Sequence, residues 1–268
     1  MSIWESIVLG IVQGLTEFLP VSSSGHLVLL QNAFGMNEPQ LFFDTMLHLG
    51  TLVAVVVVMW KNIVKLLKNP ISKTMLYLII ATIPAVVFAV VFKDFFEGAF
   101  SGMYLGYGFL FTAVVLTVSE LISRRMEKKA ASGNKKALNV PRSAAMGLMQ
   151  AVAIFPGVSR AGSTIAGGLA TGIDRRKAAS FSFLMSIPVI LGSVILQGVD
   201  VARAENVQVE WLPTIIGTVC AAISGYFAVR FMLALITKKK LYGFAVYVAL
   251  LGIFVLLDQY VFGLIGWA

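Results

Sequence analysis

Long apolar runs recur along this 268-residue chain, and short polar or basic stretches separate them. A helix needs roughly 17–25 apolar residues to cross a hydrocarbon core of about 30 Å. Six runs come close to that length and predict membrane-spanning helices, at residues 46–60, 75–92, 104–122, 180–198, 212–236 and 242–262. The pattern therefore predicts an all-α polytopic membrane protein.

Two further apolar stretches, residues 1–36 and 143–172, are interrupted midway by Gly, Ser and Pro. Proline breaks a helix, and irregular backbone is tolerated at membrane depth only where protein surrounds it. We predict that each stretch forms a re-entrant helical hairpin, which leaves the membrane on the side where it entered.

Composition agrees with a lipid environment, because 58% of the residues are hydrophobic and 13% are charged. An average soluble domain has roughly a quarter of its residues charged. We therefore treat residues 1–268 as a single membrane domain. The net charge of +8 lies mostly in the connections between apolar runs, so we expect the lipid bilayer as a partner and no nucleic acid.

The distribution of charge among the connections predicts the topology, since Lys and Arg concentrate on the cytoplasmic side of a membrane. Four connections carry more basic than acidic residues, namely 61–73, 123–142, 174–177 and 238–240. Three carry more acidic than basic residues, namely 32–45, 93–103 and 199–211. We predict that both termini lie outside and that the basic loop 123–142 is cytoplasmic. The first hairpin then enters from outside and the second from the cytoplasm.

An internal repeat supports opposite orientations of the two halves. A shift of 137 residues pairs seven identical residues, Gly10 with Gly147, Gln13 with Gln150, Phe18 with Phe155, Val21 with Val158, Ser22 with Ser159, Gly25 with Gly162 and Gly35 with Gly172. It also superimposes the three spans of repeat one, residues 1–122, on those of repeat two, residues 143–262. An odd number of spans per repeat implies an inverted-topology repeat, whose two hairpins meet near the bilayer midplane.

The first hairpin carries ionisable side chains at membrane depth, where they are costly and mark functional sites. Gln13 and Glu17 lie four residues apart and share one helix face. Ser22, Ser23, Ser24, Gly25 and His26 follow the break and can cap the next helix. We expect His48, near the outer end of a span, to be an interfacial or packing residue instead.

The second hairpin places Arg160 at the tip of its break, where a guanidinium needs an anion. Both breaks present the N-terminus of a half-helix, which favours phosphate. Ser22, Ser24 and Gly25 of the first hairpin join four residues of the second as predicted phosphate contacts, namely Ser159, Gly162, Ser163 and Thr164. A carboxylate beside phosphate needs a bridging cation, so we predict Mg²⁺ or Ca²⁺ held by Glu17 and Gln13.

The two motifs closely resemble the signatures of the undecaprenyl-diphosphatase, or bacitracin-resistance, family of bacterial inner-membrane phosphatases. They read QGLTEFLPVSSSGH from Gln13 to His26 and PGVSRAGST from Pro156 to Thr164. The resemblance implies hydrolysis of undecaprenyl diphosphate to the monophosphate that carries peptidoglycan precursors, with a divalent cation and a site that opens outward. Many members of the family have Glu where this chain has Gln13, so the metal preference here is open.

The resemblance assigns catalytic roles to Glu17, Ser23, His26 and Arg160, but the residues leave the nucleophile open. Ser23 could attack with His26 as its base, or His26 could attack directly or activate water. The rival function is an inverted-repeat transporter or flippase of a phosphate-bearing lipid or anion. A homodimer is a further assembly that the sequence permits.

Overall fold

The computed structural model describes residues 1–268 except 37–39, 93–101, 130–135, 204–209, 266 and 268. Parts of the predicted outward loops 32–45, 93–103 and 199–211 and of the basic loop 123–142 therefore lie outside the described residues. Within the described part of the chain, eleven α-helices form the fold, and the only strand-like pairing is a single bridge between Lys136 and Ile173.

Six of these helices are long and apolar enough to cross a membrane. Their candidate spans are Leu41–Val58 in α3, Lys73–Val91 in α5, Leu105–Glu127 in α7, Arg175–Leu196 in α10, Trp211–Lys238 in α11 and Tyr242–Phe262, which comprises α12 (Tyr242–Leu257) and the short π-helix Asp258–Phe262. All six predicted spans are confirmed as helices, with ends that differ by a few residues. The chain is a multi-pass membrane protein.

The two interrupted stretches each form a pair of short helices at the predicted places. The first pair is α1 (Ile3–Phe18) and α2 (Ser23–Ala33), and the second is α8 (Val140–Val152) and α9 (Arg160–Ala170). The two helices of each pair pack against each other. The break in each stretch therefore falls where Pro, Gly and Ser interrupt the apolar sequence.

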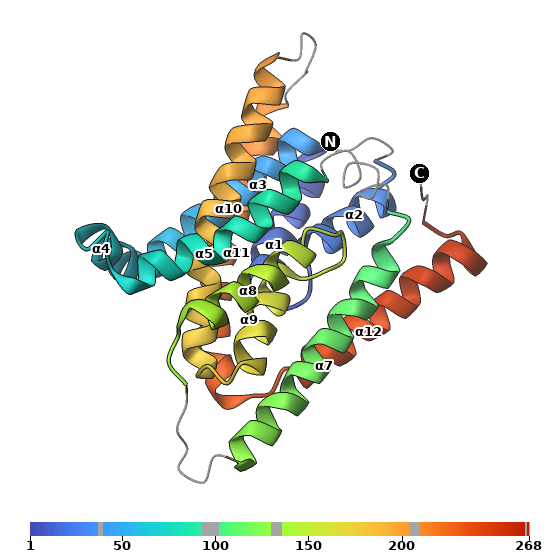
Figure 1. Cartoon of the computed structure of the whole chain (residues 1–268). Helices are drawn as coiled ribbons and strands as arrows, with labels where there is room; N and C mark the ends of the chain where they lie inside the picture. The colour runs from blue at the N-terminus through green and yellow to red at the C-terminus, as the bar shows by residue number, and fades with distance from the viewer. Residues whose placement is uncertain (37–39, 93–101, 130–135, 204–209, 266, 268) are drawn as a thin grey trace.

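One helix lies in the basic connection 61–73, where the apolar pattern does not predict a helix. Residues Trp60–Lys68 form α4, which follows α3 after a break at Met59 and lies at the edge of the bundle (Figure 1). The apolar residues Ile63 and Leu66 pack against the core, and no residue of α4 is fully buried. An amphipathic helix of this kind suits a membrane interface.

Among the shorter helices, α1, α8 and α9 lie inside the bundle, where longer helices pack around them. α1 packs on α11, α8 packs on α5, and α9 packs on α7, while α12 pairs with α7 along one side (Figure 1). Large apolar side chains such as Val57, Ile79 and Phe227 are exposed on the outside, whereas Gln13, Glu17 and Gln150 are buried. Soluble proteins instead bury most large apolar side chains and expose most polar ones, so this distribution agrees with a lipid environment.

Candidate active site

The first break is set by the backbone between α1 and α2. Helix α1 ends at Phe18, and the next helix begins at Ser23 with Ser22 as its N-cap. The Ser22 hydroxyl accepts a hydrogen bond from the Gly25 N–H at 3.4 Å. Ser22 also has φ of 69°, and it is the one non-glycine residue with a positive φ in the described part of the chain. The turn therefore presents Ser23 at the first position of the new helix.

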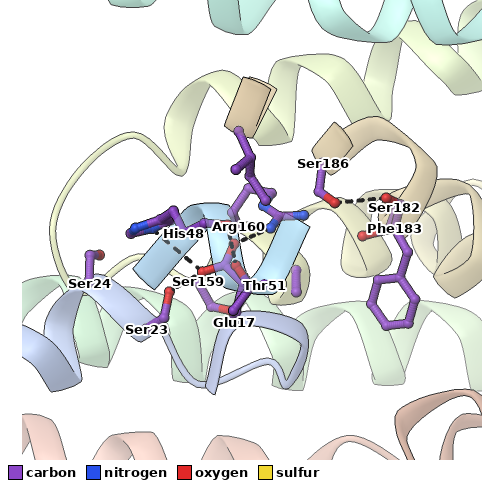
Figure 2. Close-up of polar contacts among 12 residues, drawn as sticks. Glu17, Ser23, Ser24, His48, Thr51, Ser159, Arg160, Ser182, Phe183 and Ser186 are labelled. Atoms are coloured by element: carbon purple, nitrogen blue, oxygen red, sulfur yellow. Dashed lines mark hydrogen bonds and ion pairs between the residues drawn. The ribbon is translucent and has the colours of Figure 1, made fainter. Parts of the chain in front are cut away.

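Glu17 is the centre of the site, and both of its carboxylate oxygens are engaged. Oε2 accepts hydrogen bonds from Ser23 Oγ at 2.5 Å and from Gln13 Nε2 at 3.0 Å. Oε1 accepts a hydrogen bond from Arg160 Nη2, which makes a buried ion pair. Figure 2 shows Ser23 and Arg160 reaching this carboxylate from different helices. One side chain thus joins the two predicted halves of the site.

The second break is held in place by helix α7. Thr112 Oγ1 donates to the Gly157 carbonyl at 3.0 Å and accepts from the Ser159 N–H at 3.0 Å. A Cβ on Gly108 would lie 2.1 Å from the Pro156 carbonyl oxygen, so only glycine allows α7 this close. Ser159 caps α9 by accepting from the Gly162 N–H at 3.0 Å. These contacts fix the N-terminus of α9, where Arg160 is the first residue.

The two terminal nitrogens of the Arg160 guanidinium differ in their hydrogen bonding. Nη2 pairs with Glu17, whereas Nη1 is buried and has no hydrogen-bond partner among the described residues. A buried N–H group without an acceptor is costly. The unbonded Nη1 is therefore a donor that an incoming anion could satisfy.

The other predicted phosphate contacts of the second loop differ in whether their side chains are engaged elsewhere. Gly162 touches the first loop, because a Cβ there would lie 3.2 Å from Pro20 Cβ, and Ser163 Oγ is buried without a described partner. Thr164 instead bonds the Arg160 carbonyl at 2.8 Å and Ser182 Oγ at 2.6 Å. The Thr164 hydroxyl therefore ties α9 to α10 rather than facing Glu17.

His26 lies apart from the Glu17 cluster. Its Nδ1 is 2.7 Å from the Ser22 carbonyl oxygen, and its Nε2 is 2.8 Å from Tyr247 Oη on α12. The ring stacks on Tyr247 and meets Phe109 edge-on. Both ring nitrogens are thus occupied by partners other than Ser23. Ser24 is also turned from Glu17, with its hydroxyl 3.4 Å from Ser22 Oγ.

Sequence reasoning missed three residues that contact this site. His48, expected to be an interfacial or packing residue, places Nε2 3.7 Å from Glu17 Oε2 (Figure 2). Its Nδ1 is 2.7 Å from the Asp44 carbonyl oxygen, which orients the ring. Thr112 and Tyr247, described above, hold the second loop and His26. The cost of a histidine inside an apolar span was a signal that could have found His48.

The donor set fits a divalent cation only with help from a substrate. Gln13 Oε1 is buried and has no partner among the described residues, and it lies in the same side chain that bonds Glu17. Amide and carboxylate oxygens are the ligands that Mg²⁺ and Ca²⁺ prefer. No group of three or more His, Cys, Asp or Glu in the described part of the chain could hold a metal alone. Phosphate oxygens would have to complete the coordination.

These observations define a class: a multi-pass membrane protein whose buried carboxylate, serine and arginine meet where two broken helix pairs approach each other. A family model described as bacitracin resistance protein BacA matches residues 6–254, and the chain belongs to this family. The resemblance that the two motifs indicated is therefore confirmed.

Relatives match the chain along almost its whole length. Undecaprenyl-diphosphatase 4 of a Bacillus cereus strain is 45% identical over 259 residues, which cover 96% of this chain and 97% of the relative. Undecaprenyl-diphosphatase of Carboxydothermus hydrogenoformans is 42% identical over 262 residues, covering 97% and 98%. The protein of the same name from Methanobrevibacter smithii is 40% identical over 281 residues, covering 97% and 98%.

Proposed function

We propose that this protein hydrolyses undecaprenyl diphosphate to undecaprenyl phosphate and inorganic phosphate. The activity would return the carrier lipid to peptidoglycan synthesis and confer the bacitracin resistance that the family description names. Support comes from family membership and from relatives at 40–45% identity that carry the name undecaprenyl-diphosphatase. A buried site among apolar helices also suits a substrate with a long polyprenyl tail.

The observation that carries the proposal is the contact of Glu17 with both Ser23 and Arg160. Phosphoryl transfer requires positioning of the nucleophile and stabilisation of charge on the equatorial oxygens. Glu17 supplies a base at 2.5 Å from the Ser23 hydroxyl. Arg160 Nη1 and the N-termini of α2 and α9 supply donors for the phosphate.

In the route that this geometry favours, Ser23 Oγ attacks the terminal phosphorus while its proton passes to Glu17. The bond from phosphorus to the bridging oxygen breaks, and undecaprenyl phosphate leaves with that oxygen. Glu17 passes the proton from Ser23 to the departing undecaprenyl phosphate. Water then attacks the phosphoserine and gives a proton to Glu17, which returns it to Ser23 Oγ as inorganic phosphate is released. His26 would position Ser22 and the N-terminus of α2 through its bond to the Ser22 carbonyl.

A divalent cation would supply charge neutralisation to the diphosphate. We propose that Glu17 and Gln13 hold it together with phosphate oxygens. The buried Gln13 Oε1 without a partner supports this placement. A chelator should then remove most activity, and added Mg²⁺ or Ca²⁺ should restore it.

The test is phosphate release from undecaprenyl diphosphate by the purified protein in detergent. Arg160→Ala should lose most activity and keep its helical content, whereas Arg176→Ala, which changes an exposed arginine on α10, should act like the unchanged protein. Turnover at the unchanged rate in Arg160→Ala would overturn the site. Flux of the lipid across liposomes without hydrolysis would favour the transporter instead.

We also propose that the fold is an inverted repeat built around two re-entrant hairpins. Helices α1 and α8 begin 137 residues apart, as do α7 and α12, and α2 and α9 keep this offset at both ends. The helix contacts follow the same correspondence. Helix α1 of the first repeat packs on α11 of the second, and α8 of the second repeat packs on α5 of the first. Equal offsets in sequence and packing support two copies of one unit.

The proposed orientation has both termini outside the bacterial inner membrane and the site open outward. Labelling of single cysteines in a Cys220→Ser background by a membrane-impermeant reagent tests it. Leu264→Cys should react in intact spheroplasts, while Asn69→Cys should react only after lysis. Labelling of Asn69→Cys in intact spheroplasts, with labelling of Leu264→Cys only after lysis, would indicate the opposite orientation. That outcome would not affect the proposed hydrolysis.

A further inference from the structure

A groove outside the proposed active site runs between α4, α5 and α10. It consists of two adjoining cavities of about 540 Å³ and 620 Å³, which share Leu66 and Leu184 as lining residues. Neither cavity is lined by Glu17, Ser23 or Arg160. The two differ sharply in chemistry, so the groove as a whole is amphiphilic.

The first cavity is suited to a hydrocarbon chain. Its lining is apolar side chains from α4, α5 and α10, with Thr82 as the one polar residue. The Thr82 hydroxyl donates to the Leu78 carbonyl at 2.8 Å, so its donor is already used within α5. Burial of apolar surface is therefore the only substantial interaction that this cavity offers.

The second cavity is suited to an anion. Lys65 and Lys68 line it with Asn62 and Asn69, and no acidic side chain contributes to its described lining. Ser72 also lines it and caps α5 by accepting from the Met75 N–H at 3.3 Å. The positive end of the 19-residue helix α5 thus adds to the charge of the two lysines.

Helix α4 joins the two environments because its faces differ. Ile63 and Leu66 pack toward the core, whereas Lys65 and Lys68 are exposed beside the polar cavity. No residue of α4 is fully buried, so the helix lies on the surface of the bundle. Basic amphipathic helices of this kind bind acidic lipids at the membrane interface.

We propose that this groove binds an acidic phospholipid of the surrounding bilayer. One acyl chain would fill the apolar cavity, and the phosphate would lie between Lys65, Lys68 and the N-terminus of α5. The connection 61–73 carries four basic and no acidic residues, which complements the anionic surface of the cytoplasmic leaflet. The binding is independent of hydrolysis, so it can be measured whether or not the proposed activity is found.

The headgroup is tested by native mass spectrometry of the delipidated full chain with added phosphatidylglycerol or phosphatidylcholine. Lys65→Gln with Lys68→Gln should weaken phosphatidylglycerol binding about tenfold. Lys61→Gln with Lys73→Gln removes the same charge from positions that do not line the cavity, and it should leave binding unchanged. Equal binding of both lipids, or equal losses in both double variants, would overturn the proposal.

The acyl chain is tested by filling the apolar cavity with Thr82→Phe. This change should lower phosphatidylglycerol binding several-fold while the Tm in detergent stays near that of the unchanged protein. Thr117→Phe, on α7 away from the groove, is the matched control and should bind normally. Normal binding by a folded Thr82→Phe protein would contradict the chain placement. Preferential displacement of phosphatidylglycerol by undecaprenyl phosphate would assign the groove to a different lipid.

Discussion

The Glu17 carboxylate and the Arg160 guanidinium form a buried ion pair across 143 residues of sequence. Glu17 lies in the last turn of the first helix of one broken pair, and Arg160 begins the second helix of the other. The pair therefore depends on the packing of both halves. The Ser23 hydroxyl donates a hydrogen bond to the same carboxylate. The position of the proposed nucleophile therefore depends on the packing that forms the ion pair.

Glu17→Gln should lower kcat for phosphate release at least about 100-fold, because the amide cannot take the Ser23 proton. The amide keeps the size of the side chain, so the helical content should stay unchanged. Glu127→Gln is the control, since Glu127 is half-exposed and pairs with Lys240 at 3.6 Å away from the site. Comparable activity in the two variants would exclude Glu17 as the base.

Ser23→Ala should abolish the phospho-enzyme that rapid quenching with labelled undecaprenyl diphosphate would trap on the unchanged protein. Ser24→Ala should still form the adduct, because the Ser24 hydroxyl faces Ser22 at 3.4 Å and does not contact Glu17. Peptide mapping of the adduct identifies the nucleophile. Label on His26, or turnover without an adduct in a competent trap, would contradict the serine route.

Tyr247→Phe should lower kcat roughly two- to tenfold, since it removes one hydrogen bond worth about 0.5–1.5 kcal/mol to the ring that positions Ser22. The lost bond joins Tyr247 Oη to His26 Nε2 at 2.8 Å. Tyr242→Phe provides a control on the same helix, because the Tyr242 ring lies under the Arg124 guanidinium and does not contact His26. If both phenylalanine variants keep full activity, orientation of His26 through Nε2 is unimportant.

The apolar pattern predicted the six spans and the two breaks because lipid solvation and helix length constrain them strongly. Ser22 and Ser159 were also recognisable, since each precedes a helix that needs a cap. The contacts of His48 and Tyr247 were not recognisable, because they depend on how α3 and α12 rotate about their axes. Periodicity could not assign that rotation for α12, which is apolar on every face.

The pairing inside the site was also beyond sequence reasoning. The motifs predicted that Arg160 binds phosphate, and they left His26 open as the base of Ser23, as the nucleophile or as the activator of water. The structure adds that Glu17 contacts both Ser23 and Arg160 and that His26 contacts Tyr247. The contacts of a catalytic side chain depend on distances between residues on separate helices. Spacing along the sequence does not determine these distances.

Glu120→Ala should reduce stability by about 3–5 kcal/mol, because it leaves a buried guanidinium without its carboxylate. Arg175 Nη1 donates to Glu120 Oε2 at 3.0 Å, and the Leu241 N–H donates to Oε1 at 2.8 Å. Thermal unfolding in detergent measures the loss. Glu127→Ala breaks an exposed pair and should change stability by about 0–1 kcal/mol. Similar losses in both variants would contradict the importance of burial.

Gly108→Ala should destabilise the protein by about 1–3 kcal/mol and reduce activity, because the added methyl group would displace the second loop. Its Cβ would lie 2.1 Å from the Pro156 carbonyl oxygen. Gly243→Ala adds the same methyl group to α12, where nothing lies within 4 Å, and should leave both properties intact. Unchanged activity in Gly108→Ala would show that the loop tolerates displacement.

Ser22 holds a backbone conformation that glycine would adopt at lower cost, since a positive φ strains other residues by about 1–3 kcal/mol. Its carbonyl accepts from His26 and its hydroxyl caps α2, so these contacts compensate for the strain. Ser22→Gly would relax the backbone but remove the cap beside Ser23. Glycine would therefore lower the backbone strain of the turn, but Ser23 would be held less firmly at the start of α2. Selection for stability would favour glycine at position 22, whereas selection for activity would favour serine.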